Sequence, residues 1–205
     1  MNIWFATNNT HKKDELAACL LASNSNIKLK IPSEEGLKFN PDETGSTFID
    51  NALIKARELH KLVGNSDLVI SDDSGLCVDA LNGRPGVISA IYGMENGQKI
   101  TSSQQNSLLL DELGENPVRT ARFVCSMVLL FSFDRFIIVQ ETLEGEIVKR
   151  NQIKGDGGFG YDPIFYVPHL NRTLAELTTD EKNSLSHRGK AGIQIANYIK
   201  NNAKI

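Results

Sequence analysis

The chain has few cysteines, no excess of basic residues and no long apolar run, and each absence argues against a class of protein. Its cysteines, Cys19, Cys77 and Cys125, form no CxxC pair, which argues against a zinc ribbon or a disulfide framework. We expect three reduced thiols packed as small apolar side chains. No apolar run approaches a membrane span, and Ile3 to Ala6 is too short for the apolar region of a signal peptide. These features predict a protein of the reducing cytoplasm.

The charge balance is close to neutral. Lys and Arg number 22 and Asp and Glu number 25 among 205 residues, so the net charge is −3. Broad nucleic-acid binding usually requires a basic excess, so we expect neither a nucleic-acid nor a membrane partner. A small anionic ligand remains compatible with this charge, because a pocket can be positive on a negative protein. The length suits one domain or a compact two-lobed unit.

Residues 47–63 contain the clearest helical pattern. Thr47 is suited to cap the start of this helix, with Asp50 three residues on as a variant of the capping box. The pattern predicts a helix that packs one apolar stripe against the core, formed by Phe48, Ala52, Ala56, Leu59 and Val63.

Apolar runs bounded by turn signals predict strands over residues 3–6, 68–70, 121–131 and 136–143. The last two are expected to pair as a hairpin through residues 132–135. Because helices and strands are mixed, with an antiparallel middle, the pattern predicts a mixed α/β sheet rather than a strict βαβ repeat.

An acidic run, Ser71-Asp72-Asp73-Ser74-Gly75, follows the strand over residues 68–70 directly. Adjacent carboxylates on an extended chain point to opposite faces, but a turn at Ser74-Gly75 would gather them. Two close carboxylates repel each other, and a hard divalent cation such as magnesium relieves that repulsion. A solvated turn at a strand end would use the same residues, so the run alone leaves both interpretations open.

The segment around the helix at residues 47–63 adds two features. Glu43 precedes the helix and is a second candidate metal ligand, although a charged loop residue near a helix start is the simpler interpretation. Thr47, Asn51 and Lys55 are spaced four apart and predict one polar row. Lys55 can present a positive charge to a phosphate, and a solvated helix face is the alternative.

The turn Thr7-Asn8-Asn9-Thr10-His11-Lys12 lies between a predicted strand and a predicted helix. Backbone N–H groups at a helix start attract anions, and Lys12 adds positive charge. The GxxxxGK[ST] spacing of a P-loop is absent. The turn is therefore a candidate phosphate contact of a different kind.

A glycine-rich segment runs from Gly155 to Pro163. Its glycines let the backbone approach a ligand closely, Phe159 and Tyr161 offer flat faces for a base, and Asp162 is a hydrogen-bond acceptor. A flexible loop with two core aromatic residues is the alternative.

A last helix is predicted over about residues 189–201, and three basic residues precede it: Lys182, His187 and Arg188. His187 and Arg188 can donate hydrogen bonds to a carbonyl or phosphate oxygen. A basic loop at a helix start is the alternative interpretation.

Taken together, these segments resemble the inosine/xanthosine triphosphate pyrophosphatases over nearly the whole chain. Each motif is modest support, whereas all of them in order are specific. The matching segments are Ala6-Thr7 with Asn9 and Lys12, Glu43-Thr44-Gly45 with Thr47-Phe48, Asn51-Ala52 and Lys55-Ala56, Ser71 to Leu76, Asp79-Ala80-Leu81 with Gly83 and Pro85-Gly86, Gly158 to Phe165, Ala175-Glu176-Leu177, and Lys182-Asn183 with Ser186-His187-Arg188.

The resemblance implies a magnesium-dependent homodimer with a long, twisted mixed sheet flanked by helices, in two lobes with a central cleft. It implies hydrolysis of ITP, dITP and XTP between the α and β phosphates, to the monophosphate and pyrophosphate. Asp73 would be the general base, and Glu43, Asp72 and Asp73 would hold magnesium. The residues that it assigns to the triphosphate are Thr7, Asn8, Asn9, Thr10, His11, Lys12, Lys55, Ser74 and Lys182, and those that it assigns to the purine are Phe159, Gly160, Tyr161, Asp162, His187 and Arg188.

The resemblance further implies a preference for 6-oxo purines, because donors from His187 or Arg188 would face the amino group of adenine as a second donor. Three positions depart from the family pattern: Asn8 replaces a usual glycine, Ile91 a frequent arginine and Ile153 a common proline. Two other functions stay open, a related pyrophosphatase for modified pyrimidine nucleotides and a nucleotide-binding module without catalysis.

Overall fold

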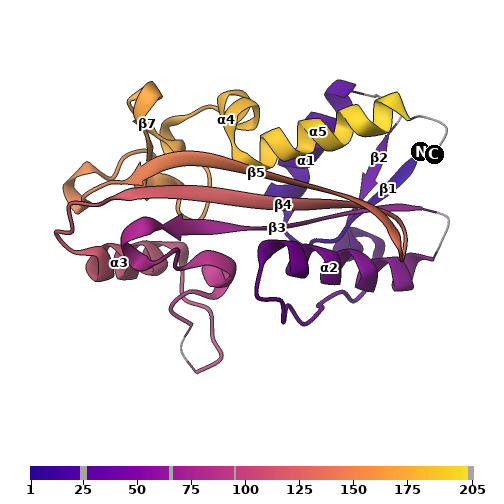
Figure 1. Cartoon of the computed structure of the whole chain (residues 1–205), viewed down its shortest axis with the longest axis horizontal. Helices are drawn as coiled ribbons and strands as arrows, with labels where there is room; N and C mark the ends of the chain where they lie inside the picture. Colours follow the sequence, from indigo (N-terminus) through magenta and orange to yellow (C-terminus); the bar gives the residue numbers. More distant parts are fainter. Residues whose placement is uncertain (24–26, 65–66, 95, 203–205) are drawn as a thin grey trace. The chain divides into compact units, whose positions relative to one another are not determined.

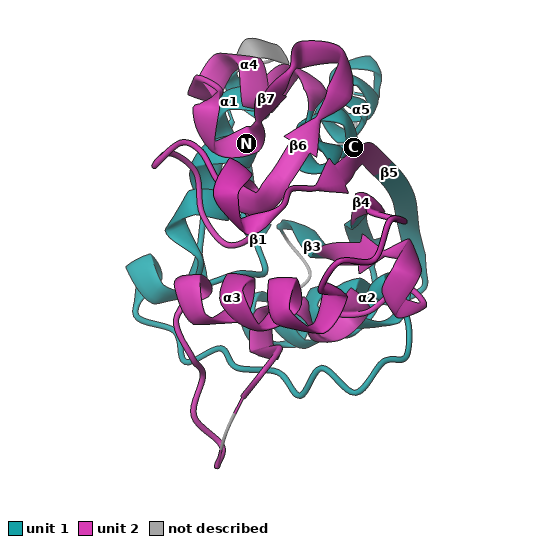
Figure 2. Cartoon of the chain, turned by 90° about the vertical axis from the view of Figure 1, so that its left-hand side faces the viewer, with its two compact units in different colours: residues 1–74, 125–141, 186–205 teal, residues 75–124, 142–185 magenta. Residues whose placement is uncertain are grey.

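A computed structural model describes residues 1–23, 27–64, 67–94 and 96–202 (Figure 1). The chain divides into two compact units (Figure 2). Unit 1 comprises residues Met1–Ser74, Cys125–Glu141 and Ser186–Ile205, and unit 2 comprises Gly75–Val124 and Thr142–Leu185.

In the described parts of the chain, seven strands form one mixed sheet in the order β2-β1-β3-β4-β5-β6-β7. Strand β1 pairs in parallel with β2 and β3, whereas β6 pairs antiparallel with β5 and β7. The mixed α/β prediction is therefore confirmed. The strands are β1 (Asn2–Phe5), β2 (Lys28–Lys30), β3 (Leu68–Val78), β4 (Thr120–Ser132), β5 (Arg135–Ile147), β6 (Phe165–Val167) and β7 (Arg172–Thr173).

Helices flank the sheet in both units (Figure 1). The α-helices are α1 (Thr10–Ser23), α2 (Phe48–Val63), α3 (Ser102–Leu113), α4 (Thr179–Leu185) and α5 (His187–Asn201). Short 3-10 helices are η1 (Pro32–Glu35), η2 (Asp79–Leu81), η3 (Gly86–Ile91), η4 (Arg150–Gln152), η5 (Asp162–Ile164), η6 (Pro168–Leu170) and η7 (Leu174–Glu176). Among the described residues, no helix is long and apolar enough to cross a membrane.

The sheet of unit 1 is buried on both faces, and successive residues of a strand face opposite layers. In β1, Ile3 and Phe5 pack in the same cluster as the apolar side chains of α1 and α5, whereas Trp4 packs with those of α2. In β3, Ile70 belongs to the α1/α5 cluster and Val69 to the α2 cluster. Figure 1 shows α1 and α5 on one side of these strands and α2 on the other. This alternation determines which layer each polar residue farther along β3 faces.

Unit 2 has a separate apolar core. Leu109 and Leu113 of α3 pack there with Leu76 and Val78 of β3, and with Phe165 of β6. The rings of Phe123 and Phe165 are 4.7 Å apart between centroids.

The predicted helix over residues 47–63 agrees closely with α2. Thr47 accepts a hydrogen bond from the backbone N–H of Asp50, and the Asp50 side chain accepts one from the backbone N–H of Thr47, which completes the capping box. The hairpin prediction is also confirmed, because β4 and β5 are neighbours joined by Phe133 and Asp134. The turn predicted at Ser74-Gly75 is wrong, since β3 continues through the acidic run to Val78.

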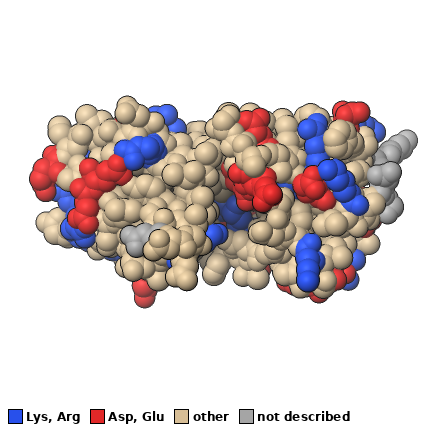
Figure 3. Space-filling view, turned by 90° about the horizontal axis from the view of Figure 1, so that it is seen from below, with Lys and Arg blue, Asp and Glu red and all other residues tan. Residues whose placement is uncertain are grey.

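Acidic and basic side chains are interspersed on the face shown in Figure 3. This mixture agrees with the small net charge of −3. All three cysteines are free thiols, as predicted, and burial raises the pKa of each.

Candidate active site

The acidic run of β3 is an extended strand, so its side chains alternate between the two faces of unit 1. Ser71 donates a hydrogen bond to the carbonyl of Ala52 in α2 and lies on the α2 face. Asp73 contacts the same helix, whereas Asp72 contacts residues of α1 and α5. The two adjacent carboxylates therefore have different partners on opposite faces, without a turn to gather them.

Asp72 is fully buried between two cations. Lys12 Nζ lies 3.0 Å from its Oδ1 and 2.9 Å from its Oδ2, and Arg188 Nε lies 3.2 Å from Oδ2. Burial alone would raise the pKa of Asp72, but Lys12 and Arg188 outweigh burial and hold it well below its ordinary value. Asp72 is therefore ionised throughout the physiological pH range.

Arg188 connects three polar groups of unit 1. Besides Asp72, its guanidinium donates to Glu15 Oε2 at 2.5 Å and to Ser74 Oγ at 2.7 Å. Because the guanidinium is charged, its hydrogen bonds to the two carboxylates and to the Ser74 hydroxyl are charge-assisted. Arg188 and Glu15 are both buried. The guanidinium therefore fixes the α1/α5 face of the acidic strand.

Asp73 is held by α2. Lys55 Nζ lies 2.7 Å from Asp73 Oδ1 and 2.7 Å from Glu43 Oε2, so one ammonium bridges the two carboxylates. Burial raises the pKa of Asp73 to about 6 against the opposing charge of Lys55. Burial would lower the pKa of Lys55, but the carboxylates of Asp73, Asp72 and Glu43 raise it. A carboxylate with a pKa near neutrality is suited to accept a proton.

The predicted turn Thr7 to Lys12 includes the first residues of α1, because this helix begins at Thr10. Asn9 Oδ1 accepts a hydrogen bond from the backbone N–H of Lys12 at 3.2 Å, and Thr7 Oγ1 accepts one from the N–H of Asn9 at 3.1 Å. Thr10 and His11 are exposed at the first turn of the helix. Lys12 points from this turn to Asp72, so the turn and the acidic strand belong to one polar centre in unit 1.

The carboxylates of this centre fit a magnesium ion as a pair. Glu43 and Asp73 share one lysine, and Glu43 Oε1 accepts no hydrogen bond within the described residues. Magnesium is commonly bound through one or two carboxylates together with water and substrate phosphates. In the described part of the chain no group of three or more His, Cys, Asp or Glu side chains is placed to hold a metal. The pair Glu43 and Asp73 is therefore a better candidate magnesium site than the predicted set of Glu43, Asp72 and Asp73.

The glycine-rich loop of unit 2 is organised around Asp162. Its Oδ2 accepts hydrogen bonds from the backbone N–H of Phe159 and from Lys182 Nζ, each at 2.7 Å. Lys182 Nζ also lies 4.5 Å from the centroid of the Phe159 ring, a cation–π contact. Phe159 is partly exposed, and its ring is the flat face that this loop offers.

Tyr161 and Gly160 anchor the same loop. Tyr161 is buried in the core of unit 2 and donates its hydroxyl to the carbonyl of Ser89 at 2.9 Å. The carbonyl of Gly160 accepts a hydrogen bond from Asn106 Nδ2 at 3.0 Å. A pocket of about 300 Å³ lies between this loop and the start of α3, lined by Phe159, Gly160, Asn106 and Ile153 among others.

The sequence matches a known protein family over nearly its whole length. The profile of the Ham1 family matches residues 3–198. The chain belongs to the Ham1 family.

Relatives and solved structures of this family cover nearly the whole chain. A protein of Treponema denticola named dITP/XTP pyrophosphatase is 47% identical over 98% of this chain and 99% of its own length. One of Nostoc with the same name is 47% identical over 91% of this chain and 88% of its own. The structure of a HAM1 protein from Coxiella burnetii superposes with a TM-score of 0.86 and 37% identity, covering 98% of this chain and 99% of that one.

The structure shows the surroundings of the three positions that were expected to depart from the family pattern, Asn8, Ile91 and Ile153. Asn8 has no left-handed backbone conformation, and its Nδ2 donates to the carbonyl of Phe39 at 2.7 Å, so a glycine is not required there. Ile91 is exposed at the end of η3, and Ile153 is exposed beside the pocket of unit 2.

Two predicted site residues lie in unexpected surroundings. Arg188, expected to contact the purine, bonds Glu15, Asp72 and Ser74 in the acidic centre. Lys182, expected to contact the triphosphate, lies against Phe159 and Asp162 in the glycine-rich loop. His187 is buried at the start of α5.

The sequence analysis assigned no role to Glu15, because acidic residues near the start of a helix, such as Asp14 and Glu15, are ordinary. Since α1 begins at Thr10, they lie in its second turn, and Glu15 is buried on Arg188. Asn51 was placed in the polar row of α2 but given no role, although its Nδ2 reaches Asp73.

The glycine loop offers a matched test of the position of Asp162. Gly158 and Gly160 both have a positive φ, 70° and 63°, so alanine at either position introduces backbone strain of about 1 kcal/mol. An added Cβ at Gly158 would lie 2.1 Å from Asp162 Oδ2, whereas one at Gly160 would meet nothing within 4 Å. We expect Gly158→Ala to lower the melting temperature clearly more than Gly160→Ala. Equal losses of melting temperature in the two variants would contradict the close packing of Asp162 against Gly158.

Proposed function

We propose that this protein hydrolyses dITP, ITP and XTP to the nucleoside monophosphate and pyrophosphate, and so removes non-standard purine nucleotides. The main support for this proposal is the environment of Asp73. Its buried carboxylate has a raised pKa and lies beside Lys55, which also pairs with Glu43. The relatives at 47% identity are named dITP/XTP pyrophosphatases, which fits a hydrolase of acid anhydrides.

The residues of unit 1 are proposed to act on the triphosphate. Asp73 accepts the proton of the attacking water, and the oxygen of that water bonds to the α phosphorus. The bond from this phosphorus to the oxygen that bridges to the β phosphate breaks, with pyrophosphate as the leaving group. Lys12, Lys55 and the N–H groups of the turn Thr7 to Lys12 offset the phosphate charge. Ser74, fixed by Arg188, offers its hydroxyl as a further contact.

Magnesium is the proposed cofactor. Glu43 and Asp73 would hold it, whereas Asp72, the third predicted carboxylate, pairs with Lys12 and Arg188 on the opposite face of β3. When bound, the ion supplies neutralisation of phosphate charge and activation of water. Asp72 has a separate task in any case, because it orients Lys12 and Arg188.

The loop of unit 2 is proposed to bind the purine. Phe159 offers its ring for stacking, and Asp162 accepts hydrogen bonds from the edge of the base. Gly160 and Tyr161 hold the loop, and Lys182 covers the ring of Phe159. The guanidinium of Arg188 bonds Glu15, Asp72 and Ser74, so Arg188 is proposed to hold Ser74 rather than to contact the purine.

A substrate panel tests this function. With magnesium, we expect XTP, ITP and dITP to be hydrolysed with a kcat/KM at least about 100-fold above that for ATP, because a buried donor facing a donor is costly. Pyrophosphate and orthophosphate are quantified separately. Orthophosphate as the first product, or faster turnover of modified UTP or CTP than of XTP, would reject the proposal.

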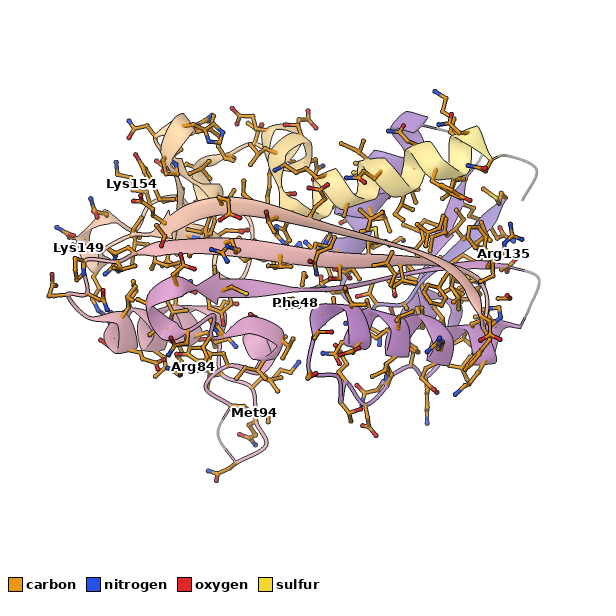
Figure 4. All side chains as sticks on the ribbon, in the orientation of Figure 1. Phe48, Arg84, Met94, Arg135, Lys149 and Lys154 are labelled. Atoms are coloured by element: carbon orange, nitrogen blue, oxygen red, sulfur yellow. The ribbon has the colours of Figure 1, made fainter. Side chains whose placement is uncertain are left out.

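We further propose a homodimer in the cytoplasm. Large apolar side chains are exposed on η3 and α3 of unit 2, namely Ile88, Ile91 and Leu108. Met94, labelled in Figure 4, is exposed on the loop after η3. Apolar patches of this kind often mark contact surfaces. Sedimentation equilibrium is expected to give twice the chain mass of 22.6 kDa, and a stable monomer at micromolar concentration would contradict it.

A further inference from the structure

We propose that Asn51 is a positioning residue. It holds Asp73 and the loop that carries Glu43 in the relative positions that the reaction requires. The proposal rests on the proposed function. Asn51 lies on α2 and is only 3% exposed. Its Oδ1 accepts a hydrogen bond from the backbone N–H of Gly45 at 2.8 Å, and its Nδ2 donates to Asp73 Oδ2 at 3.4 Å. One amide thus joins two segments that carry carboxylates.

Asn51 and Lys55 form two parallel connections between the same partners. They are one helical turn apart on α2, so both side chains face the same way. Lys55 joins Glu43 to Asp73 Oδ1, and Asn51 joins Gly45 to Asp73 Oδ2. The two oxygens of Asp73 are therefore held separately, one by a cation and one by a neutral amide.

Lys55 is positively charged and Asn51 is neutral, so substrate and metal affect their contacts differently. A triphosphate attracts Lys55, and a divalent cation at Glu43 and Asp73 repels it. Both effects weaken the ion pairs that Lys55 makes with the two carboxylates. A neutral amide is affected far less, so Asn51 maintains the connection when substrate and metal are bound.

Gly45 shows how closely the loop approaches this amide. A Cβ added to Gly45 would lie 2.5 Å from Asp50 Cβ, 2.7 Å from Asn51 Oδ1 and 2.9 Å from the backbone N of Asn51. Because these contacts involve the backbone and first side-chain atoms of α2, a larger residue would push the loop away. The absence of a side chain at Gly45 therefore permits the short bond to Asn51.

The test compares Asn51→Ala with a matched control. Binding of Mn²⁺, as a probe for magnesium, is measured without nucleotide by electron paramagnetic resonance, and kcat is measured with XTP at saturating magnesium. We expect Asn51→Ala to bind Mn²⁺ about tenfold more weakly and to lose roughly 10- to 100-fold in kcat. Gln105→Ala is the control, since Gln105 is a buried helix amide that donates to the carbonyls of Ser89 and Tyr92 in unit 2. It is expected to stay within about twofold of the wild type in both measurements.

Asn51→Asp separates the two ends of the connection and preserves the shape of the side chain. It keeps an acceptor for Gly45 but replaces the donor to Asp73 by a like charge. We expect Mn²⁺ binding at least as tight as in the wild type, with kcat still about tenfold lower or more. A folded Asn51→Ala or Asn51→Asp with wild-type kcat would overturn the proposal, as would equal losses in Gln105→Ala. A wild type that hydrolyses no triphosphate would instead refute the proposed function, while Mn²⁺ binding would still report on Asn51.

Discussion

Replacing Asp73 by asparagine is expected to lower kcat for XTP by roughly 10³-fold, the loss typical of removing a general base. Asparagine preserves the size of the side chain and still accepts a hydrogen bond from Lys55, so the fold is expected to persist. Because burial raises the pKa of Asp73 to about 6, its ionised form costs stability as the pH rises above the unfolded-state value. The melting temperature of Asp73→Asn relative to the wild type is therefore expected to increase between about pH 4 and pH 6 and to stay constant at higher pH.

Asp14→Asn is the matched control, because Asp14 is an exposed carboxylate of α1. It is expected to keep wild-type kcat. If Asp73→Asn retains kcat within a few-fold of the wild type, Asp73 is not the base.

Replacing Arg188 by methionine is expected to produce the largest loss of stability. Arg188 is buried and bonds two buried carboxylates, Asp72 and Glu15. Breaking a buried ion pair by removing one partner typically costs about 3–5 kcal/mol. For a chain of this size that corresponds to a fall in melting temperature of about 10 °C.

The pH dependence of Arg188→Met gives a second measurement. In the wild type the pKa of Asp72 is held below its unfolded-state value, so its contribution to stability is fully present above that value and is lost only in stronger acid. Without Arg188, Asp72 keeps Lys12 as its ion-pair partner but loses the second cation, so its pKa is expected to lie closer to its ordinary value. The difference in melting temperature between the wild type and Arg188→Met is therefore expected to be larger at pH 7 than near pH 3, where protonation of Asp72 in the variant removes part of the uncompensated charge.

Arg122→Met is the control for this loss, since Arg122 bonds Asp79 and Glu144 at an exposed position. It is expected to change the melting temperature by no more than about 2 °C. Combining Arg188→Met with Glu15→Gln should restore part of the lost stability. A melting temperature for Arg188→Met equal to that of Arg122→Met would show that the buried network contributes little.

Local signals in the sequence were sufficient for α2 and its polar row. Thr47 and Asp50 fixed its start through bonds between neighbours, and the spacing of Asn51 and Lys55 placed both on one side. The strand period would also have assigned Asp72 and Asp73 to opposite faces. The predicted turn failed because Leu76 and Val78 continue the buried strand beyond the acidic run.

Contacts between distant segments could not be read from spacing. Glu15 and Arg188 are 173 positions apart, and each looked like an ordinary charge near a helix start. Lys182 was assigned to the triphosphate, yet it contacts Phe159 and Asp162, about 20 residues earlier in the chain. Such partners depend on sheet order and helix packing, which one sequence leaves open.

The identity of the products tests the central claim most directly. The wild type and Asp73→Asn are incubated with XTP and magnesium, and the phosphorus species are followed by ³¹P nuclear magnetic resonance. The account predicts that the wild type forms equal amounts of xanthosine monophosphate and pyrophosphate, without the diphosphate, and that Asp73→Asn forms neither at a comparable rate. Orthophosphate with the nucleoside diphosphate, or undiminished pyrophosphate from Asp73→Asn, would contradict it.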